Sequence, residues 1–132
     1  MVKIAATYIG DGRVELVHGP SGEKIITDLP TDNGGQARSF SPTDLAAASI
    51  ASCILSIMSL LAKSNKIDLT GASIEIEKHM IENPRRIDKF IGVIKLPPDL
   101  KAQQKEKLLS CVKACPVSRS LHPDVKVEFS VD

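Results

Sequence analysis

The first forty residues contain three short segments in which β-branched and small residues mix or alternate with polar ones. This pattern is typical of strands, which we expect over residues 2–8, 13–18 and 24–28. The turn signals Gly10-Asp11-Gly12 and Gly19-Pro20-Ser21-Gly22 separate them and favour hairpin connections. Residues 29–39 combine Pro, Asn, Asp and two Gly, so we expect a loop there.

A helix start signal follows at Ser41-Pro42-Thr43-Asp44. Ser41 can cap a helix, Pro42 suits its first position, and Asp44 can reach back to the N–H of the capping residue. The apolar run behind it extends to Lys63, and its four serines fall with Lys63 on one narrow stripe of a helical wheel. We therefore expect one long helix, buried on most of its circumference.

The second half of the chain predicts two more strands, a helix and a last strand. The strands are expected over residues 72–80, where isoleucines alternate with glutamates, and over residues 87–96. An amphipathic helix is expected over residues 99–114 and ends before Pro116. The last strand is expected over residues 125–131. The order βββ-α-ββ-α-β, with antiparallel hairpins, indicates an α+β fold in a single domain spanning residues 1–132.

Composition narrows the classes of function. The 132 residues are 42% hydrophobic and carry a net charge of +1, with only 3% aromatic residues. Such a chain can bury a core, but it lacks the charge and the stacking rings of a nucleic-acid-binding protein and the charge of a membrane-surface protein. The first residues have no apolar core of signal-peptide length, so we expect a cytoplasmic protein. Residues 45–61 are short for a membrane span.

Three cysteines are the candidate reactive groups, and each also has an ordinary interpretation. Cys53 lies in the middle of the long helix, where a free cysteine is commonly a small core residue, although alanines there allow close approach and serines could donate to a thiolate. Cys115 precedes a proline at a helix break, which usually leaves some access. For Cys111, one turn earlier, core packing is the better interpretation.

A reactive Cys53 would need a cation. The thiolate is the nucleophile, and a free thiol has a pKa of about 8.5. Cys53 lies about three turns into its helix, beyond the reach of the helix dipole. Arg13 and Arg38 are the candidates for that cation, followed by Arg85 and Arg86. Each could equally be a solvated surface arginine, and the spacing does not choose between Arg13 and Arg38.

A metal site is the competing interpretation of the second cysteine pair. Cys111, Cys115 and His122 have the spacing C-x3-C-x6-H. A structural zinc site needs four ligands, and these three lack the paired ligands of a zinc finger. The sequence therefore offers little support for zinc.

Two segments together resemble a known family. The stretch FSPTDLAAASIASC from Phe40 to Cys53, followed by CPVS from Cys115 to Ser118, is similar to the osmotically inducible protein C and organic hydroperoxide resistance (OsmC/Ohr) family. The two motifs stand about 60 residues apart, in the expected order and elements. The PTDL form resembles the broader OsmC-like branch.

The resemblance implies a fold and an activity. It implies an intertwined homodimer with two active sites at the subunit interface. The family's two redox cysteines match Cys53, which would attack an organic hydroperoxide and become a sulfenic acid, and Cys115, which would close a disulfide with it. An external dithiol would restore both cysteines, without a metal or haem. The expected function is a thiol-dependent peroxidase in oxidative-stress defence.

The chain departs from the family in the groups that support the reactive cysteine. The family places an arginine from the N-terminal strand region beside that sulfur, and Arg13 is the nearest match. Many members have a glutamate ten residues before the cysteine, where this chain has Thr43. Asp44 could substitute for it or could serve only in the helix cap. This departure motivates an alternative function, a small-molecule-binding or redox-sensing protein of the same fold with weak or no peroxidase activity.

Overall fold

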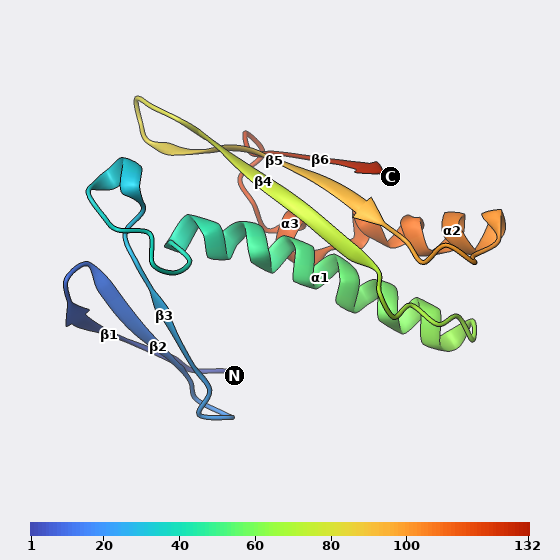
Figure 1. The fold of residues 1–132 in the computed structure, drawn as a ribbon, viewed down its shortest axis with the longest axis horizontal. Helices are drawn as coiled ribbons and strands as arrows, with labels where there is room; N and C mark the ends of the chain where they lie inside the picture. Colours follow the sequence, from blue (N-terminus) through green and yellow to red (C-terminus); the bar gives the residue numbers. More distant parts are fainter. The chain divides into compact units, whose positions relative to one another are not determined.

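The computed structural model describes all 132 residues, which form two compact units (Figure 1). The first unit is Met1–Leu45 and the second is Ala46–Asp132, so the boundary falls within the first turn of a long helix. The α+β class predicted from the sequence is confirmed, while the single domain over residues 1–132 stays a prediction.

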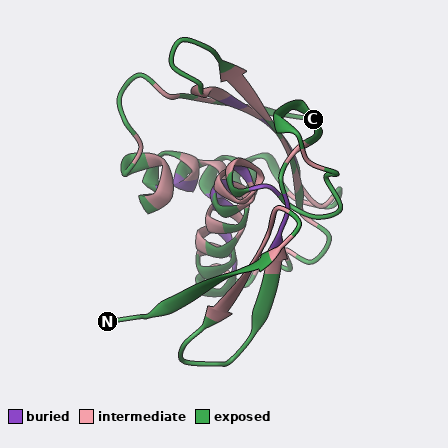
Figure 2. Ribbon diagram, turned by 90° about the vertical axis from the view of Figure 1, so that its left-hand side faces the viewer, coloured by how far each residue is buried: buried purple, intermediate pink, exposed green.

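The first unit is a three-stranded antiparallel sheet followed by a loop. Its strands are β1 (Ile4–Gly10), β2 (Arg13–His18) and β3 (Lys24–Thr27), in the order β1-β2-β3. The β1–β2 turn places Gly10, Asp11 and Gly12 at positive φ, which glycine adopts without strain. β1 is exposed along almost its whole length (Figure 2). The predicted loop contains one short 3₁₀ helix, η1 (Thr31–Asn33).

The long helix α1 (Pro42–Ser64) begins at the predicted cap. The Asp44 N–H donates to Ser41 Oγ at 3.1 Å, and the Ser41 N–H donates to an Asp44 carboxylate oxygen at 2.9 Å. The predicted polar stripe is confirmed as the exposed side of the helix, comprising Ser49, Ser52, Ser56, Ser59 and Lys63. Pro42 carries no N–H, and the cap pairs the N–H groups of Ser41 and Asp44. The helix can therefore start at this point with few unpaired N–H groups.

The second unit contains the other sheet. Strand β4 (Ser73–Ile81) pairs antiparallel with β5 (Arg86–Lys95), and β5 pairs parallel with β6 (Lys126–Val131). The expectation of purely antiparallel pairing is therefore wrong for β6. The helical segment between β5 and β6 carries the chain back to the starting end of β5, and such a crossover permits parallel pairing.

That crossover contains three short helices instead of the one predicted helix. They are α2 (Ala102–Leu109), the 3₁₀ helix η2 (Ser110–Ala114) and α3 (Pro116–Arg119). The chain direction changes at Cys115, whose ψ of 113° is extended. This is the break that the sequence predicts before Pro116.

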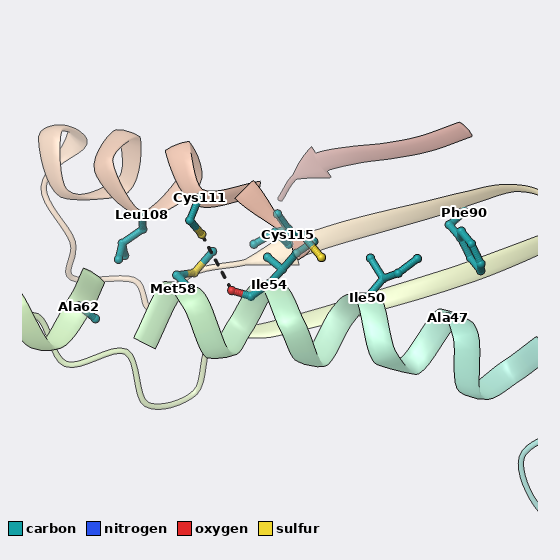
Figure 3. Close-up of a cluster of buried hydrophobic side chains, with 10 residues drawn as sticks. Ala47, Ile50, Ile54, Met58, Ala62, Phe90, Leu108, Cys111 and Cys115 are labelled. Carbon is teal, nitrogen blue, oxygen red and sulfur yellow. Dashed lines mark hydrogen bonds between the residues drawn. The ribbon is translucent and has the colours of Figure 1, made fainter. Parts of the chain in front are cut away.

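The core of the second unit lies between α1, the crossover helices and β5 (Figure 3). Five residues at helical spacing on α1 are buried: Ala47, Ile50, Ile54, Met58 and Ala62. They pack with Phe90 and Ile94 of β5 and with Leu108 of α2. Within one chain, α1 is thus fully buried along a single stripe, which half-buried apolar positions flank. This is less burial than the sequence predicts.

α1 is also long and apolar enough to cross a membrane, by length and composition alone. Its most apolar stretch has a mean hydropathy of 2.2, and 28% of that stretch is buried within the chain. The core helix of a soluble protein meets the same criterion. In the second unit, α1 supplies five of the buried core residues.

Candidate active site

The fold of the second unit brings Cys53 and Cys115 together. Cys53 lies in the middle of α1, and Cys115 lies at the N-terminal cap of α3. Both are free thiols, and their side chains hydrogen-bond to each other. Residues 62 positions apart in the sequence, the difference between 53 and 115, therefore form one dithiol site.

The two thiols differ in access. Cys53 is half-buried, whereas Cys115 is 0% exposed. The expectation that the helix break would leave Cys115 accessible is wrong. The extended backbone at Cys115 turns its side chain inward, and the following Pro116 takes the exposed position. The Cys115 sulfur then packs among the core residues of α1 (Figure 3).

Backbone N–H groups at the start of α3 point at the sulfur atoms. The Ser118 N–H donates to Cys115 Sγ at 3.4 Å, so the thiol takes the place of a capping oxygen. The Val117 N–H favours the charged form of both cysteines. Ser118 Oγ is buried and makes no hydrogen bond of good geometry in this dithiol state.

The pKa values of the two thiols shift in opposite directions. Burial, together with the hydrogen bond to Cys115, raises the pKa of Cys53. Burial also opposes ionisation of Cys115, but hydrogen bonds from Ser118, Cys53 and Val117 outweigh it and lower the pKa of Cys115. Within this unit, the shared negative charge of the pair is favoured on Cys115.

The helix serines do not supply the donors expected for a Cys53 thiolate. Ser49 Oγ donates to the Ala46 carbonyl at 2.7 Å, and Ser59 Oγ donates to the Ser56 carbonyl at 2.6 Å. Hydroxyls on a helix commonly bond back to the preceding turn in this way. The donor that favours a Cys53 thiolate is instead the Val117 N–H, while the Cys53 thiol itself donates to Cys115, so the serine prediction is wrong.

Cys111 is a core residue, as the sequence favours. It is 3% exposed, and its thiol points to the Ile54 carbonyl oxygen at 3.9 Å (Figure 3). Burial raises its pKa. No group of three or more His, Cys, Asp or Glu side chains is arranged to hold a metal ion, so the structure adds no support to the zinc interpretation of Cys111, Cys115 and His122.

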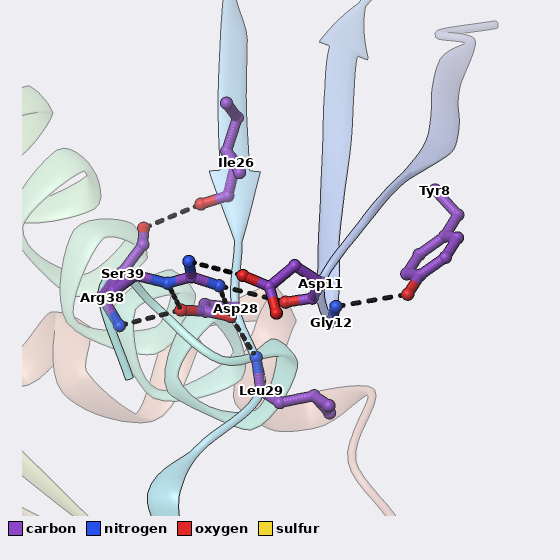
Figure 4. A network of polar contacts seen from close by, with 8 residues as sticks. All are labelled: Tyr8, Asp11, Gly12, Ile26, Asp28, Leu29, Arg38 and Ser39. Atoms are coloured by element: carbon purple, nitrogen blue, oxygen red, sulfur yellow. Dashed lines mark hydrogen bonds and ion pairs between the residues drawn. The ribbon is translucent and has the colours of Figure 1, made fainter. Parts of the chain in front are cut away.

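Arg38, in the first unit, is fully engaged in a polar network (Figure 4). Its Nε lies 2.7 Å from Asp28 Oδ2, its Nη1 lies 2.9 Å from Asp11 Oδ2, and its Nη2 donates to the Asp11 carbonyl at 3.0 Å. Asp28 is 1% exposed. The hydrogen bonds from Arg38 hold the pKa of Asp28 well below its usual range, and the two carboxylates raise the pKa of Arg38. These contacts tie the loop to the first hairpin.

Arg13 is at the start of β2, opposite Gly10 of β1. Its side chain is half-buried, and its Nε is buried without a hydrogen-bond partner. A buried unpaired guanidinium N–H is costly, so such groups usually have a partner. Of the two leading candidates, Arg13 and Arg38, Arg13 is the one with an unused donor.

The remaining candidates have local roles. Asp44 forms the helix cap with Ser41 described above, and Thr43 Oγ1 lies 3.2 Å from Ser41 Oγ. Arg85 pairs with Glu82 at 3.2 Å, and Arg86 donates to the Ile87 carbonyl at 2.9 Å.

Sequence reasoning missed the donors of Val117 and Ser118. A signal for them is present in the sequence, because Cys115-Pro116 has the same form as Ser41-Pro42, a capping residue followed by proline at the first helical position. Read in this way, the cysteine would be expected to accept hydrogen bonds from the first turn of a helix.

Comparisons with known proteins place this geometry in context. The family described as OsmC-like protein matches residues 34–130. A solved structure from Psychrobacter arcticus 273-4, provisionally named an osmotic stress induced and detoxification response protein, is 36% identical with a TM-score of 0.94, and the match covers 100% of this chain and 96% of that one. A search of the curated proteins found no match.

Two structures named as organic hydroperoxide resistance proteins share the fold at lower identity. The protein from Legionella pneumophila is 24% identical with a TM-score of 0.75, covering 100% of this chain and 96% of that one. The OhrB protein of Bacillus subtilis is 18% identical with a TM-score of 0.69, covering 100% and 98%.

Proposed function

Because this chain belongs to the OsmC-like protein family, we propose that it is a thiol-dependent peroxidase that reduces organic hydroperoxides through Cys53 and Cys115. The observation that carries the proposal is the hydrogen-bonded pair of free thiols formed by these two cysteines. Two structural neighbours named as organic hydroperoxide resistance proteins support the choice of substrate class.

The reaction needs two electrons and no cofactor. The Cys53 thiolate attacks the terminal peroxide oxygen, the O–O bond breaks, and the leaving alkoxide takes a proton to become the alcohol. Cys53 is then a sulfenic acid. Cys115 attacks its sulfur, a Cys53–Cys115 disulfide forms, and water leaves. An external dithiol supplies two electrons and two protons, which regenerate both thiols and leave the dithiol oxidised.

Solvent access and pKa support assigning the peroxide-attacking role to Cys53 and the resolving role to Cys115. Cys53 is the thiol with exposed surface, so it is the one that a peroxide can reach in the proposed reaction. Cys115 is buried beside it and carries the lowered pKa, which suits a resolving thiol that attacks within the protein. The pKa of Cys53 is raised and no cation is among the groups that shift it, so the proposed reaction calls for a cation that favours its thiolate. We assign that role to Arg13, because its Nε lacks a partner whereas Arg38 is occupied.

We also propose the homodimer that the family resemblance implies. The support within this chain is the apolar surface of α1, where Leu60 is 69% exposed and most of the helix's apolar stretch is unburied. Burying such surface against a second copy would be favourable by roughly 25 cal/mol per Å². Cys53 is half-buried and lies on this same helix, which is consistent with an active site at the subunit interface.

One observation favours a second candidate function. The raised pKa of Cys53, with no cation among the groups that shift it, suits a slow thiol in a small-molecule-binding or redox-sensing protein. Rapid turnover would exclude this alternative.

Steady-state consumption of cumene hydroperoxide with dihydrolipoamide tests the proposal. We expect turnover by the wild type, none by Cys53→Ser, and a single turnover at most by Cys115→Ser. Cys111→Ser is the matched control and should retain wild-type rates, because Cys111 is a core residue. Equal turnover by Cys53→Ser and wild type would overturn the proposal.

A further inference from the structure

The Cys53–Cys115 disulfide of the proposed cycle can be reduced from either end. A dithiol that attacks Cys53 expels Cys115 as a thiolate, and attack on Cys115 would expel Cys53. Disulfide exchange is governed by access to the attacked sulfur and by the pKa of the leaving thiol, with the lower pKa leaving faster. Both factors can be read from the residues around the pair.

Access favours attack on Cys53. Cys53 is half-buried on α1, while Cys115 is 0% exposed and packs in the core with Ile54 and Leu108. A reductant could reach Cys115 Sγ only by opening this core. The sulfur that leaves is therefore the buried one.

Beside the Val117 N–H, Ser118 supplies the leading donors for that leaving sulfur. Its N–H already donates to Cys115 Sγ at 3.4 Å. Its Oγ is buried and makes no well-formed hydrogen bond while Cys115 is a neutral thiol. A hydroxyl rotates about its Cβ–Oγ bond, so its proton can turn to the sulfur once Cys115 is charged, and hydrogen bonds to a charged acceptor are the stronger ones.

We propose that Ser118 holds Cys115 as the leaving thiolate, through its N–H and its hydroxyl, and so directs the external dithiol to Cys53. This inference rests on the disulfide of the proposed function and adds the direction of its reduction. The incoming thiolate bonds to Cys53 Sγ, the Cys53–Cys115 bond breaks, and the electron pair stays on Cys115. The second thiol of the reductant then attacks its own mixed disulfide, releasing Cys53 and the oxidised reductant.

The lowered pKa of Cys115 supports the assignment of Ser118. Its hydroxyl and N–H are the leading groups that lower the pKa of Cys115 against the effect of burial. Ser120, two residues on, provides a contrast on the same short helix, because its hydroxyl is exposed and donates to the Pro116 carbonyl at 2.8 Å. Ser120 therefore serves as the matched control.

The test starts from protein oxidised with diamide, so that forming the disulfide requires no peroxidase activity. Reduction by excess dithiothreitol is followed by acid quenching and mass spectrometry for wild type, Ser118→Ala, Ser118→Thr and Ser120→Ala. We expect Ser118→Ala to be reduced about 10-fold more slowly. Ser118→Thr and Ser120→Ala should keep the wild-type rate, since both retain a hydroxyl at position 118.

A second measurement locates the attack. Glutathione, a monothiol, is added to the oxidised wild type, and the quenched mixed disulfide is mapped by peptide analysis. We expect glutathione on Cys53. An adduct on Cys115, equal slowing in Ser118→Ala and Ser120→Ala, or failure of diamide to join Cys53 with Cys115 would each overturn the inference. Protein that is reduced as expected but consumes no peroxide would instead overturn the proposed function alone.

Discussion

At the scale of single residues, the environment of each sulfur sets its chemistry. The pKa of Cys115 is lowered by donors of the turn that follows it, whereas the pKa of Cys53 is raised by burial. The donors at Cys115 are local in sequence and could have been predicted from the Cys-Pro signal. The burial of Cys115 could not, because the residues that cover it belong to α1, far away in the sequence.

The assignment of Arg13 as the activating cation predicts a change in the pH dependence of activity. Arg13→Ala should lower kcat/KM at pH 7 by at least about 10-fold and move the rise of the rate to higher pH, since each unit of pKa costs about 10-fold in thiolate. The measurement is the pH–rate profile for cumene hydroperoxide. Arg38→Ala should instead lower stability, with a profile like that of the wild type. A pH–rate profile that shifts in Arg38→Ala and stays unchanged in Arg13→Ala would contradict the account.

The Asp28–Arg38 pair predicts a pH-dependent contribution to stability. The pKa of Asp28 in the folded protein lies below its ordinary 3.8, so its contribution is present above pH 3.8 and is lost as the pH falls towards the folded value. Asp28→Asn should therefore lower the urea midpoint at pH 7 and have much less effect at pH 2. An equal loss at both pH values would show that the pair stabilises through packing alone.

At the scale of elements, periodicity predicted most of the structure. The observed strand β2 spans residues 13–18 as predicted, and α1 begins at the predicted cap because that signal is local. The parallel pairing of β6 with β5 was not predictable in the same way, since it depends on where the crossover returns the chain. The division of that crossover into three short helices is likewise set by packing on the core.

Substitutions at the N-terminal cap of α1 can distinguish a structural role of Asp44 from a role in activity. Ser41→Ala should cost about 1 kcal/mol of stability, because Ser41 Oγ accepts the Asp44 N–H at 3.1 Å. Asp44→Asn should cost less, and its kcat/KM should match that of Ser41→Ala. Urea unfolding and steady-state kinetics of the two variants provide the measurements. A specific loss of activity in Asp44→Asn would assign Asp44 to the support of Cys53.

At the scale of the whole molecule, the two cysteines and the two arginines fall in different compact units. Cys53 and Cys115 belong to Ala46–Asp132, and Arg13 and Arg38 belong to Met1–Leu45. The sequence names all four residues as candidates, but spacing along a chain carries no information on how such units assemble. Activation of Cys53 is therefore a property of the assembled protein in the proposed function.

The proposed homodimer makes a prediction about mass in solution. Light scattering coupled to size exclusion should give the mass of two chains over a wide range of concentration. Leu60→Asp should shift the protein towards one chain, because it places a charge on the exposed apolar surface of α1. A wild type with the mass of one chain at all concentrations would contradict the dimer.

The most direct test of the central claim is a single oxidation followed by weighing. Reduced protein is treated with one equivalent of cumene hydroperoxide, quenched, and examined by intact mass and peptide mapping. The account predicts a loss of two hydrogen atoms per chain, a Cys53–Cys115 disulfide, and Cys111 still reduced. An unchanged mass, or a disulfide that excludes Cys53, would contradict it.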